Sequence, residues 1–324
     1  MREDEIVAKL RTILSPKIGD DGAVIGDQVI TTDMLVEGVD FTADVPLRFV
    51  ARKSLAVNLS DIAAMGARPT YAVAAVGVRR EDQARLEPFF RALREAADEY
   101  GVEIVGGDLS SAPITIVCIT AFGRIESRPL LRSGAKAGDR IYVSRTLGAS
   151  GAGLELLQRG WTVGESGGVK APATTGFELR ELGGSAIRRH IDPAAECELG
   201  PLLASIAEVS ACIDISDGLS TDLSRLCEAS GCGALIERER LPVFPDLLAA
   251  APQLGFRASE LVLHGGEEYA LLFTSSLRES EMSARLGRPV YAIGRIRRER
   301  GVVLMIDGVE SVLEARGFDH FAAS

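Results

Sequence analysis

The chain has 324 residues, of which 46% are hydrophobic and 25% charged, so it is long enough for two ordinary domains with apolar cores. Its 46 acidic residues outnumber 36 basic ones and give a net charge of −10, which argues against a protein that binds duplex nucleic acid. No apolar run is long enough for a membrane span, and segment 1–10 lacks the apolar stretch of a signal peptide. We therefore expect a cytoplasmic enzyme.

The five cysteines are odd in number and include no C-x-x-C pair, which indicates neither a disulfide framework nor a zinc site. We expect them to be reduced core residues. The acidic balance also bears on possible substrates, because an acidic protein repels phosphates unless cations intervene. Divalent metal ions would remove that repulsion.

The first part of the chain alternates predicted helices and strands. Apolar residues at Ile6, Val7, Leu10, Ile13 and Leu14 have helical spacing, and Pro46 and Gly66 suit the start and end of a second helix. The predicted helices span 3–14, 46–65 and 82–100, and the predicted strands span 29–32, 71–78, 102–105 and 114–124.

The polar, glycine-bearing segment 132–139 predicts a domain boundary, with an N-terminal domain over 1–135 and a C-terminal domain over 136–324. Beyond it we predict helices over 148–159, 198–208 and 220–230, strands over 140–144, 211–215, 269–273, 290–296 and 302–306, and a surface loop over 161–184. This alternation indicates an α/β fold, or α+β with mixed sheets.

The common nucleotide-binding motifs are absent. No G-x-x-x-x-G-K-[ST] occurs, no G-x-G-x-x-G opens a helix, and no H-R-D or D-F-G segment occurs. The sequence therefore excludes a P-loop enzyme and gives no sign of a protein kinase.

Carboxylates beside small residues recur along the chain, and we expect them at strand ends or helix starts. The segments are Gly19-Asp20-Asp21-Gly22, Thr31-Thr32-Asp33, Asn58-Leu59-Ser60-Asp61, Gly106-Gly107-Asp108, Asp214-Ile215-Ser216-Asp217 and Gly265-Gly266-Glu267-Glu268. Any one of them could be a turn or a helix cap. Six such segments in one chain are harder to explain as turns and caps, and Asp61 lies inside an otherwise apolar helix, where a carboxylate needs a cation or hydrogen-bond donors around it. Together they favour a magnesium site shared with substrate phosphates.

The remaining candidates are few. The chain has only three histidines, His190, His264 and His320, so a Ser-His-Asp triad is not indicated, and a lone histidine is more often structural. Trp161 could be only a packing anchor. Phe318 could dock a chain end on the core or, less commonly, stack on a ligand.

Taken in order, these segments resemble the thiamine-monophosphate kinases, a family of the aminoimidazole-ribotide-synthetase-like superfamily. The matching segments include 18–24, 31–38, 53–67, 106–108, 132–139, 214–219, 265–269 and 317–321, so the resemblance covers almost the whole chain. It implies an N-terminal α/β domain that pairs with its twin to close a barrel in a homodimer, with a C-terminal α/β domain beside it. It also implies Mg²⁺-assisted, direct transfer of the γ-phosphoryl group of ATP to thiamine monophosphate.

The resemblance also implies roles for individual residues. The implied metal ligands are Asp21, Thr31, Thr32, Asp33, Asp61, Asp108, Asp214 and Asp217; the implied ATP contacts are Gly107, Asp108, Arg132 and Ser216; and the implied thiamine contacts are Asp40, Glu267 and Phe318. Among these, Asp61, Asp217 and Arg132 would serve catalysis most directly. Several magnesium ions and Arg132 would neutralise two anionic reactants and hold them in line.

Some positions depart from the family pattern, and two alternatives stay open. The departures are Asp40, Ser111, Ala149, Glu196 and Glu268, of which Ser111 and Glu196 stand where basic residues are expected. The alternatives are a sister ATP-dependent enzyme of the superfamily and a catalytically silent nucleotide- or metal-binding homologue. A selenophosphate synthetase would want a reactive cysteine near the N-terminus, whereas the first cysteine here is Cys118.

Overall fold

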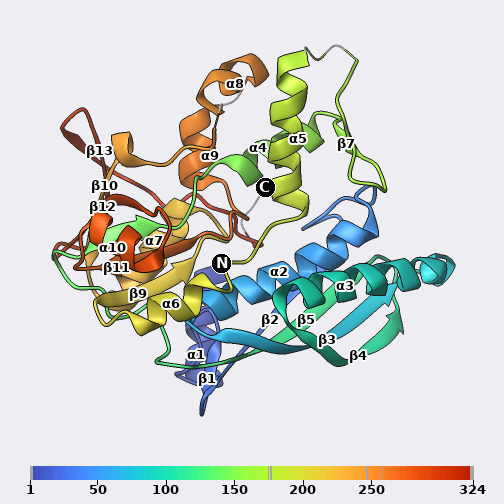
Figure 1. Ribbon diagram of the computed structural model, residues 1–324, viewed down its shortest axis with the longest axis horizontal. Coiled ribbons are helices and arrows are strands. Elements are labelled where there is room, and N and C mark those ends of the chain that lie inside the picture. Colours follow the sequence, from blue (N-terminus) through green and yellow to red (C-terminus); the bar gives the residue numbers. More distant parts are fainter. Residues whose placement is uncertain (1–2, 174, 176, 246, 256, 322–324) are drawn as a thin grey trace.

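The computed structural model describes residues 3–173, 175, 177–245, 247–255 and 257–321. Two mixed sheets with flanking helices make up most of the described chain (Figure 1). This confirms the predicted α/β class with mixed sheets. None of the helices formed by the described residues combines the length and apolar character needed to cross a membrane.

The first sheet lies in the N-terminal part of the chain. It has five strands in the order β1-β2-β5-β3-β4, and every pair is antiparallel except β3 with β4. The strands are β1 (Ala23–Ile25), β2 (Gln28–Val36), β3 (Arg68–Val78), β4 (Glu103–Ser111) and β5 (Ile116–Arg124). The helices of this part are α1 (Glu3–Ile13), α2 (Leu47–Ala64) and α3 (Leu86–Tyr100), with a short 3-10 helix, η1 (Arg80–Arg85).

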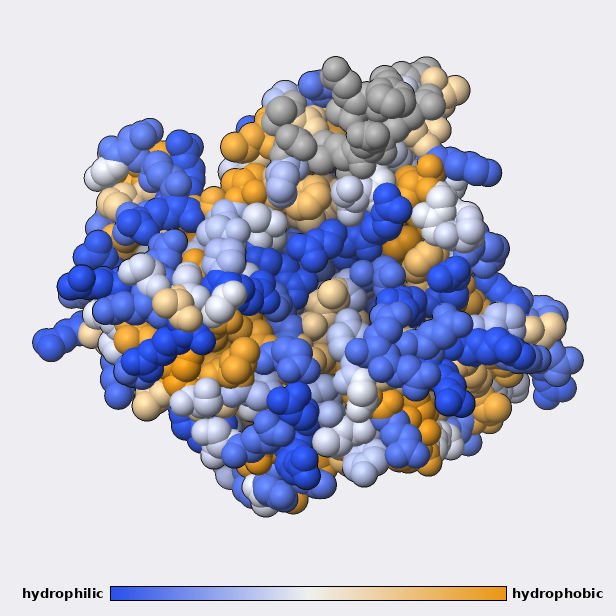
Figure 2. All heavy atoms as spheres, viewed as in Figure 1, coloured by the Kyte–Doolittle hydropathy of each residue, from blue (hydrophilic) through white to orange (hydrophobic). Residues whose placement is uncertain are grey.

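Helices α2 and α3 lie on one face of this sheet (Figure 1). Burial along β3 follows the period of a strand: Ala72, Ala74 and Val76 are buried against the helices, whereas Tyr71 on the opposite face is 47% exposed. Hydrophobic residues reach the surface at the lower right of Figure 2, where Figure 1 shows β3 and β4. The outer face of the sheet is therefore apolar and uncovered within the described chain.

The second sheet has seven strands in the order β14-β13-β10-β12-β6-β11-β9, with only β10 and β13 parallel. Its strands are β6 (Arg140–Val143), β9 (Val209–Asp214), β10 (Gly233–Glu237), β11 (Leu271–Ser275), β12 (Tyr291–Arg297), β13 (Gly301–Ile306) and β14 (Val309–Val312). The other elements are α4 (Ala149–Gln158), β7 (Thr162–Val163), β8 (Val169–Lys170), α5 (Phe177–Ile191), α6 (Leu199–Ser205), α7 (Leu219–Ser230), η2 (Arg238–Arg240), α8 (Leu247–Leu254), α9 (Ala258–His264) and α10 (Glu279–Leu286).

Several predicted elements differ from the structure, among them the strand predicted over 29–32, which is β2 and continues to Val36. The helix predicted over 82–100 begins only at Leu86, because Pro88 cannot donate the backbone hydrogen bond that a helix begun at 82 would require of it. Strand β4 continues to Ser111 through two glycines, since parallel pairing with β3 outweighs their weak strand propensity. The loop predicted over 161–184 instead contains the β7–β8 hairpin and the start of α5, and Trp161 is buried.

Helix α2 lies between the two sheets and contacts β2 and β5 on one side and β9 on the other. Fifteen of its 18 residues are buried, so it has no solvent-facing polar stripe. Its polar residues Lys53, Asn58 and Ser60 are buried as well. A helix enclosed in this way must satisfy each polar side chain with partners from the surrounding elements.

Glu196, one of the departures noted in the sequence, is the centre of a buried ion-pair network. Its carboxylate accepts hydrogen bonds from Arg145 at 2.8 Å, from Arg288 at 2.6 Å and from the Ser144 hydroxyl at 3.1 Å. Burial alone would raise the pKa of Glu196, but the two arginines lower the pKa by more than burial raises it. The pKa of Glu196 therefore lies below its ordinary value. Glu196 therefore joins the segment before α6 to the ends of β6 and α10.

Replacing Glu196 by alanine leaves two arginines without their buried partner. We expect Glu196→Ala to reduce the free energy of unfolding by about 3 kcal/mol, measured by urea denaturation. The matched control is Glu198→Ala, because the Glu198 side chain is 85% exposed and its ion pair with Arg68 should contribute at most about 1 kcal/mol. Equal effects of the two substitutions would contradict this assignment.

Candidate active site

A cleft of about 850 Å³ runs between the two sheets. Its walls come from β2, α2, the loops after β9 and α9, and the segment at 316–320. The cleft contains most of the residues singled out in the sequence: Asp21, Thr31, Thr32, Asp33, Asp40, Asp61, Arg132, Asp214, Ser216, Asp217, Glu267 and Phe318. Residues far apart in the chain thus meet in one cavity.

Three carboxylates lie at the centre of the cleft. Asp21 precedes β1, Asp61 lies in the last turn of α2, and Asp214 ends β9. One oxygen from each lies within 4.8 Å of the others. Three acidic groups at this separation repel one another strongly unless a cation lies between them.

The hydrogen bonds around this cluster leave it short of donors. The Thr31 hydroxyl donates to Asp61 at 2.6 Å, and the Ser60 hydroxyl donates to Asp214 at 2.6 Å. Arg132 binds only Oδ1 of Asp21, at 2.5 Å, and Asp21 Oδ2 is buried without a partner among the described residues. A buried carboxylate oxygen without a donor, beside two further carboxylates, fits a divalent cation with oxygen ligands.

Burial and mutual repulsion shift the titration of this cluster. Burial raises the pKa of Asp21, and Arg132 opposes that rise without cancelling it. Burial, and then repulsion from Asp33, Asp214 and Asp21, raises the pKa of Asp61 well above its usual range. Burial and repulsion from Asp21 do the same to the pKa of Asp214. The protein alone therefore does not stabilise all three charges, and a bound cation would.

Strand β2 presents its polar residues to both faces. Thr31 and Asp33 lie on the face toward α2, where the Asp33 backbone donates to Asn58 at 2.9 Å. Burial and neighbouring carboxylates raise the pKa of Asp33 to about 6. The Thr32 hydroxyl instead donates to the carbonyl of Ile119 at 3.0 Å, toward the outer face. These residues lie within a strand and not at its end, which corrects the position expected from the sequence.

Gly107 and Asp108 do not line the cleft. Both lie in the middle of edge strand β4, and Asp108 pairs in register with Ala75 on the outer face of the first sheet. A side chain at Gly107 would clash with the backbone of β3, since a Cβ would lie 1.9 Å from the carbonyl oxygen of Ala74. Within one chain, therefore, these two predicted ATP and metal contacts are separate from the other predicted site residues.

The loop after β9 carries Ser216 and Asp217 and is fixed by a residue that the sequence analysis missed. The Asp222 carboxylate accepts hydrogen bonds from the backbone of Asp217 and Gly218, both at 3.0 Å, and from Arg225 at 3.1 Å. Arg225 also pairs with Asp217. Burial and the Asp217 charge raise the pKa of Asp222 to about 7.

Two of the predicted organic-substrate residues, Asp40 and Glu267, are joined through Lys53 and form what we call the organic end of the cleft, and Phe318 lines the same cleft. Glu267 pairs with Lys53 at 2.5 Å and with His190 at 3.0 Å. Asp40 accepts a hydrogen bond from the Val36 backbone at 2.7 Å. Phe318 is 50% exposed in the cleft, and its ring lies edge-on to His320.

The other departures have structural roles. Glu268 accepts hydrogen bonds from the backbone of Gly148 at 2.8 Å and Ser150 at 3.1 Å, so it satisfies free donors at the start of α4. Ala149 is the buried first residue of that helix. Ser111 is exposed at the end of β4, away from the cleft.

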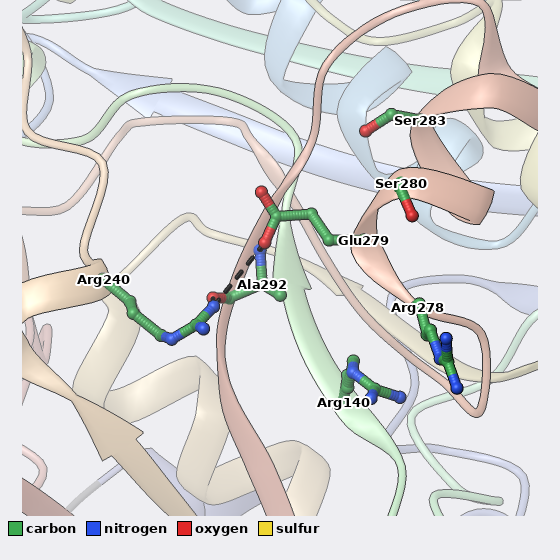
Figure 3. Close-up of a pocket in the computed structure, with 7 residues that line it drawn as sticks. All are labelled: Arg140, Arg240, Arg278, Glu279, Ser280, Ser283 and Ala292. Carbon is green, nitrogen blue, oxygen red and sulfur yellow. Dashed lines mark hydrogen bonds and ion pairs between the residues drawn. The ribbon is translucent and has the colours of Figure 1, made fainter.

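A second, smaller pocket of about 490 Å³ lies on the second sheet (Figure 3). It is lined by Arg140, Arg240, Arg278, Glu279, Ser280, Ser283 and Ala292. Figure 3 shows Arg240 joined to Glu279, with Nη1 and Oε2 3.6 Å apart. The Ala292 backbone also donates to Glu279 at 3.3 Å. None of the predicted site residues lies here.

Four of the side chains that contact the predicted site residues had no site role assigned from the sequence. They are Lys53, His190, Asp222 and Arg225. The only signal for Lys53 was its occurrence in a nearly apolar helix, where a cation needs a partner. The ion-pair partner of Lys53, Glu267, lies more than 200 residues away in the chain and could not be found from local patterns, whereas Asp222 and Arg225 lie within eight residues of Asp217.

Comparisons with known proteins show the family to which the chain belongs. The family model described as AIR synthase related protein, N-terminal domain, matches residues 19–125, and the model for the C-terminal domain matches residues 136–307. The thiamine-monophosphate kinase of Escherichia coli K12 is 37% identical over 318 residues, which cover 94% of this chain and 91% of that protein. The corresponding Aquifex aeolicus protein is 32% identical over 316 residues, covering 96% and 95%.

Solved structures extend these comparisons. The structure of AaThiL complexed with AMPPCP and TMP has a TM-score of 0.85 at 31% identity and covers 99% of this chain and 97% of that one. The hydrogenase maturation protein HypE of Escherichia coli has a TM-score of 0.68 at 21% identity, covering 96% and 97%, which shows a shared fold alone.

The carboxylate cluster predicts how stability depends on pH and metal. For an acid whose pKa rises on folding, stability is lost as the pH rises from the unfolded pKa toward the folded one. We therefore expect Mg²⁺ to raise the Tm more at pH 8 than at pH 5.5, because the ionised cluster binds a cation more tightly. Asp61→Asn should lose most of this Mg²⁺ effect and be the more stable protein in EDTA at pH 8. An unchanged response of the variant to Mg²⁺ would contradict the metal site.

Proposed function

The chain, which carries both AIR synthase related domains, belongs to the thiamine-monophosphate kinase family, and we propose that it transfers the γ-phosphoryl group of ATP to thiamine monophosphate. The product would be thiamine diphosphate. The single observation that carries the proposal is the cleft itself, which combines a cation-demanding carboxylate cluster with Asp40, Glu267 and Phe318.

The metal requirement follows from the ligand set. Asp21, Asp61 and Asp214 would hold Mg²⁺, with Thr31, Asp33 and Asp217 beside them in the same cleft. Bound Mg²⁺ would act as a Lewis acid and template that offsets the charge of two phosphate groups. AMPPCP, an analogue of ATP, occurs in the similar AaThiL complex, which supports ATP as the phosphoryl donor.

The protein's own contribution is positioning. Arg132 is held against Asp21 by its side chain and against Asp20 by its backbone N–H at 3.1 Å, so the guanidinium has a fixed location at the cluster. A fixed cation beside the phosphates stabilises the charge of the transferring group. Asp222 holds the loop with Ser216 and Asp217 in one conformation. No covalent intermediate is needed, because phosphate attacks phosphate directly.

The organic part of the acceptor is a cation with two aromatic rings. Asp40 and Glu267 supply negative charge to it, and the exposed ring of Phe318 offers a surface for stacking. Burial raises the pKa of Asp40, but an approaching cation would oppose that shift and favour the ionised form.

We propose that the chain forms a homodimer through the outer face of its first sheet. Met34 and Tyr71 on this face are 56% and 47% exposed, which is unusual for large apolar side chains unless a partner covers them. Pairing there would cover Asp108 and bring it into an interface, consistent with its proposed role with Gly107 in ATP and metal binding. We also propose that the chain divides into its two domains between residues 135 and 136. Light scattering should give twice the chain mass of 34.5 kDa.

The proposed activity is tested with purified protein, ATP and Mg²⁺, by ADP release and product identification with and without thiamine monophosphate. We expect ADP release that depends on thiamine monophosphate and yields thiamine diphosphate. Asp61→Asn should nearly abolish turnover while the circular dichroism spectrum stays that of the wild type. Wild-type protein that binds ATP with Mg²⁺ but makes no thiamine diphosphate would overturn the proposal in favour of a sister activity or a silent homologue.

Phe318 distinguishes stacking from simple docking of the chain on the core. The backbone of this segment is already held, since Gly317 donates to Thr221 at 2.8 Å and Phe318 donates to Asp217 at 3.2 Å. Removal of the ring should therefore leave the segment bound. We expect Phe318→Ala to raise the KM for thiamine monophosphate on the order of tenfold, with little change for ATP. An equal change in both KM values would indicate a docking role.

A further inference from the structure

Lys53 is a buried cation that the phosphoryl transfer itself does not require. It lies in the middle of α2 with only 3% of its side chain exposed. A buried ammonium group is costly unless it is paired, and its partners identify what it does. Its Nζ lies 2.5 Å from Oε1 of Glu267 and donates to the backbone carbonyl of Asp40 at 3.3 Å. Lys53 thus joins the two acidic residues at the organic end of the cleft.

His190 holds the other oxygen of the same carboxylate. It is 6% exposed in α5, and its Nδ1 lies 3.0 Å from Oε2 of Glu267. Lys53 and His190 together outweigh the effect of burial and lower the pKa of Glu267 to about 2, so this group is ionised. Because a carboxylate only accepts hydrogen bonds, Nδ1 carries the hydrogen, and the Ser150 hydroxyl oxygen, 3.1 Å from the same nitrogen, is then a second acceptor for it. Burial lowers the pKa of His190, which is consistent with a neutral ring protonated on Nδ1.

The backbone at Glu267 also depends on these contacts. Its φ is +58°, in the left-handed region that residues other than glycine rarely adopt. The Glu267 backbone N–H donates to the carbonyl of Ser216 at 2.6 Å. Such a conformation persists where the surroundings fix it, and it is common at functional sites. Here the side-chain contacts come from both sides of the cleft, with Lys53 on α2 and His190 on α5.

We propose that Lys53 and His190 are positioning residues that hold the Glu267 carboxylate, and through Lys53 the Asp40 segment, in the arrangement that receives the cationic part of the acceptor. This inference rests on the proposed function. Each oxygen of Glu267 has one lone-pair direction engaged, and the 26% of the side chain that is exposed is left for the substrate. The charge of Lys53 also limits repulsion between Asp40 and Glu267, which would otherwise push the two carboxylates apart.

The test measures calorimetric binding of thiamine monophosphate without ATP, together with kcat and both KM values. We expect Lys53→Met to weaken binding of thiamine monophosphate and raise its KM on the order of tenfold to a hundredfold, with the KM for ATP unchanged. The matched control is Lys170→Met, which removes an exposed lysine in β8 and should behave as the wild type. Thermal unfolding of each variant reports whether the fold is kept.

His190 gives an independent test that does not rely on Lys53. The asparagine amide nitrogen is the same number of bonds from the backbone as Nδ1, whereas the glutamine amide is one bond further. We therefore expect His190→Asn to retain most of the affinity for thiamine monophosphate and His190→Gln to lose it. A purely structural role would make the two variants equal in affinity or would change only the Tm.

A double-mutant cycle tests whether Lys53 acts through Glu267. We expect Lys53→Met/Glu267→Gln to bind thiamine monophosphate no more weakly than Glu267→Gln alone, because both changes remove one interaction. Additive losses, or equal losses for ATP and thiamine monophosphate, would overturn the inference while wild-type turnover upheld the proposed function. If the wild-type protein neither binds nor phosphorylates thiamine monophosphate, the inference and the proposed function are both overturned. That outcome is seen with the wild-type protein alone, before any variant is measured.

Discussion

Mutual repulsion among Asp21, Asp61 and Asp214 is the constraint on which the arrangement of this protein depends. One oxygen from each lies within 4.8 Å of the others, in a region where burial already disfavours charge. The surrounding fold therefore has to hold the three residues together, and ionisation of all three requires a cation between them. The two sheets and helix α2 between them hold the three residues in these positions. The centre of the cleft thus has an excess of negative charge that the side chains of the protein do not neutralise.

Helix α2 connects this cluster to the organic end of the cleft. Asp61 and Ser60 lie in its last turns beside the carboxylates, and Lys53 lies two turns earlier beside Glu267. The rise of an α-helix separates such positions by about 12 Å, which is comparable to the span of a pyrophosphate and an aromatic ring. One rigid buried element therefore sets the spacing between the metal-binding and substrate-binding ends.

Local patterns in the sequence predicted much of this, and their failures have physical causes. Asp61 was correctly expected inside a largely buried helix because most of the residues around it are apolar. Strand β4 was predicted too short, because the preference of Gly106 and Gly107 for turns is local whereas their pairing with β3 is not. The partnership of Lys53 with Glu267 joins residues more than 200 positions apart, so only the folded chain reveals it. Glu196, which stands where a basic residue was expected, does not line the cleft and instead binds Arg145 and Arg288.

Three side-chain contacts that cross the cleft limit how the two sheets can move relative to each other. Ser60 binds Asp214, Lys53 binds Glu267, and Arg132 on the segment between the sheets binds Asp21. A hinge that swung the two sheets apart would break all three buried contacts at once and expose unpaired charges. Substrates would then have to enter and leave along the edge of the cleft, with the two sheets staying fixed as a frame. Turnover in such an enzyme would be gated by the rim of the cleft and not by the opening of its domains.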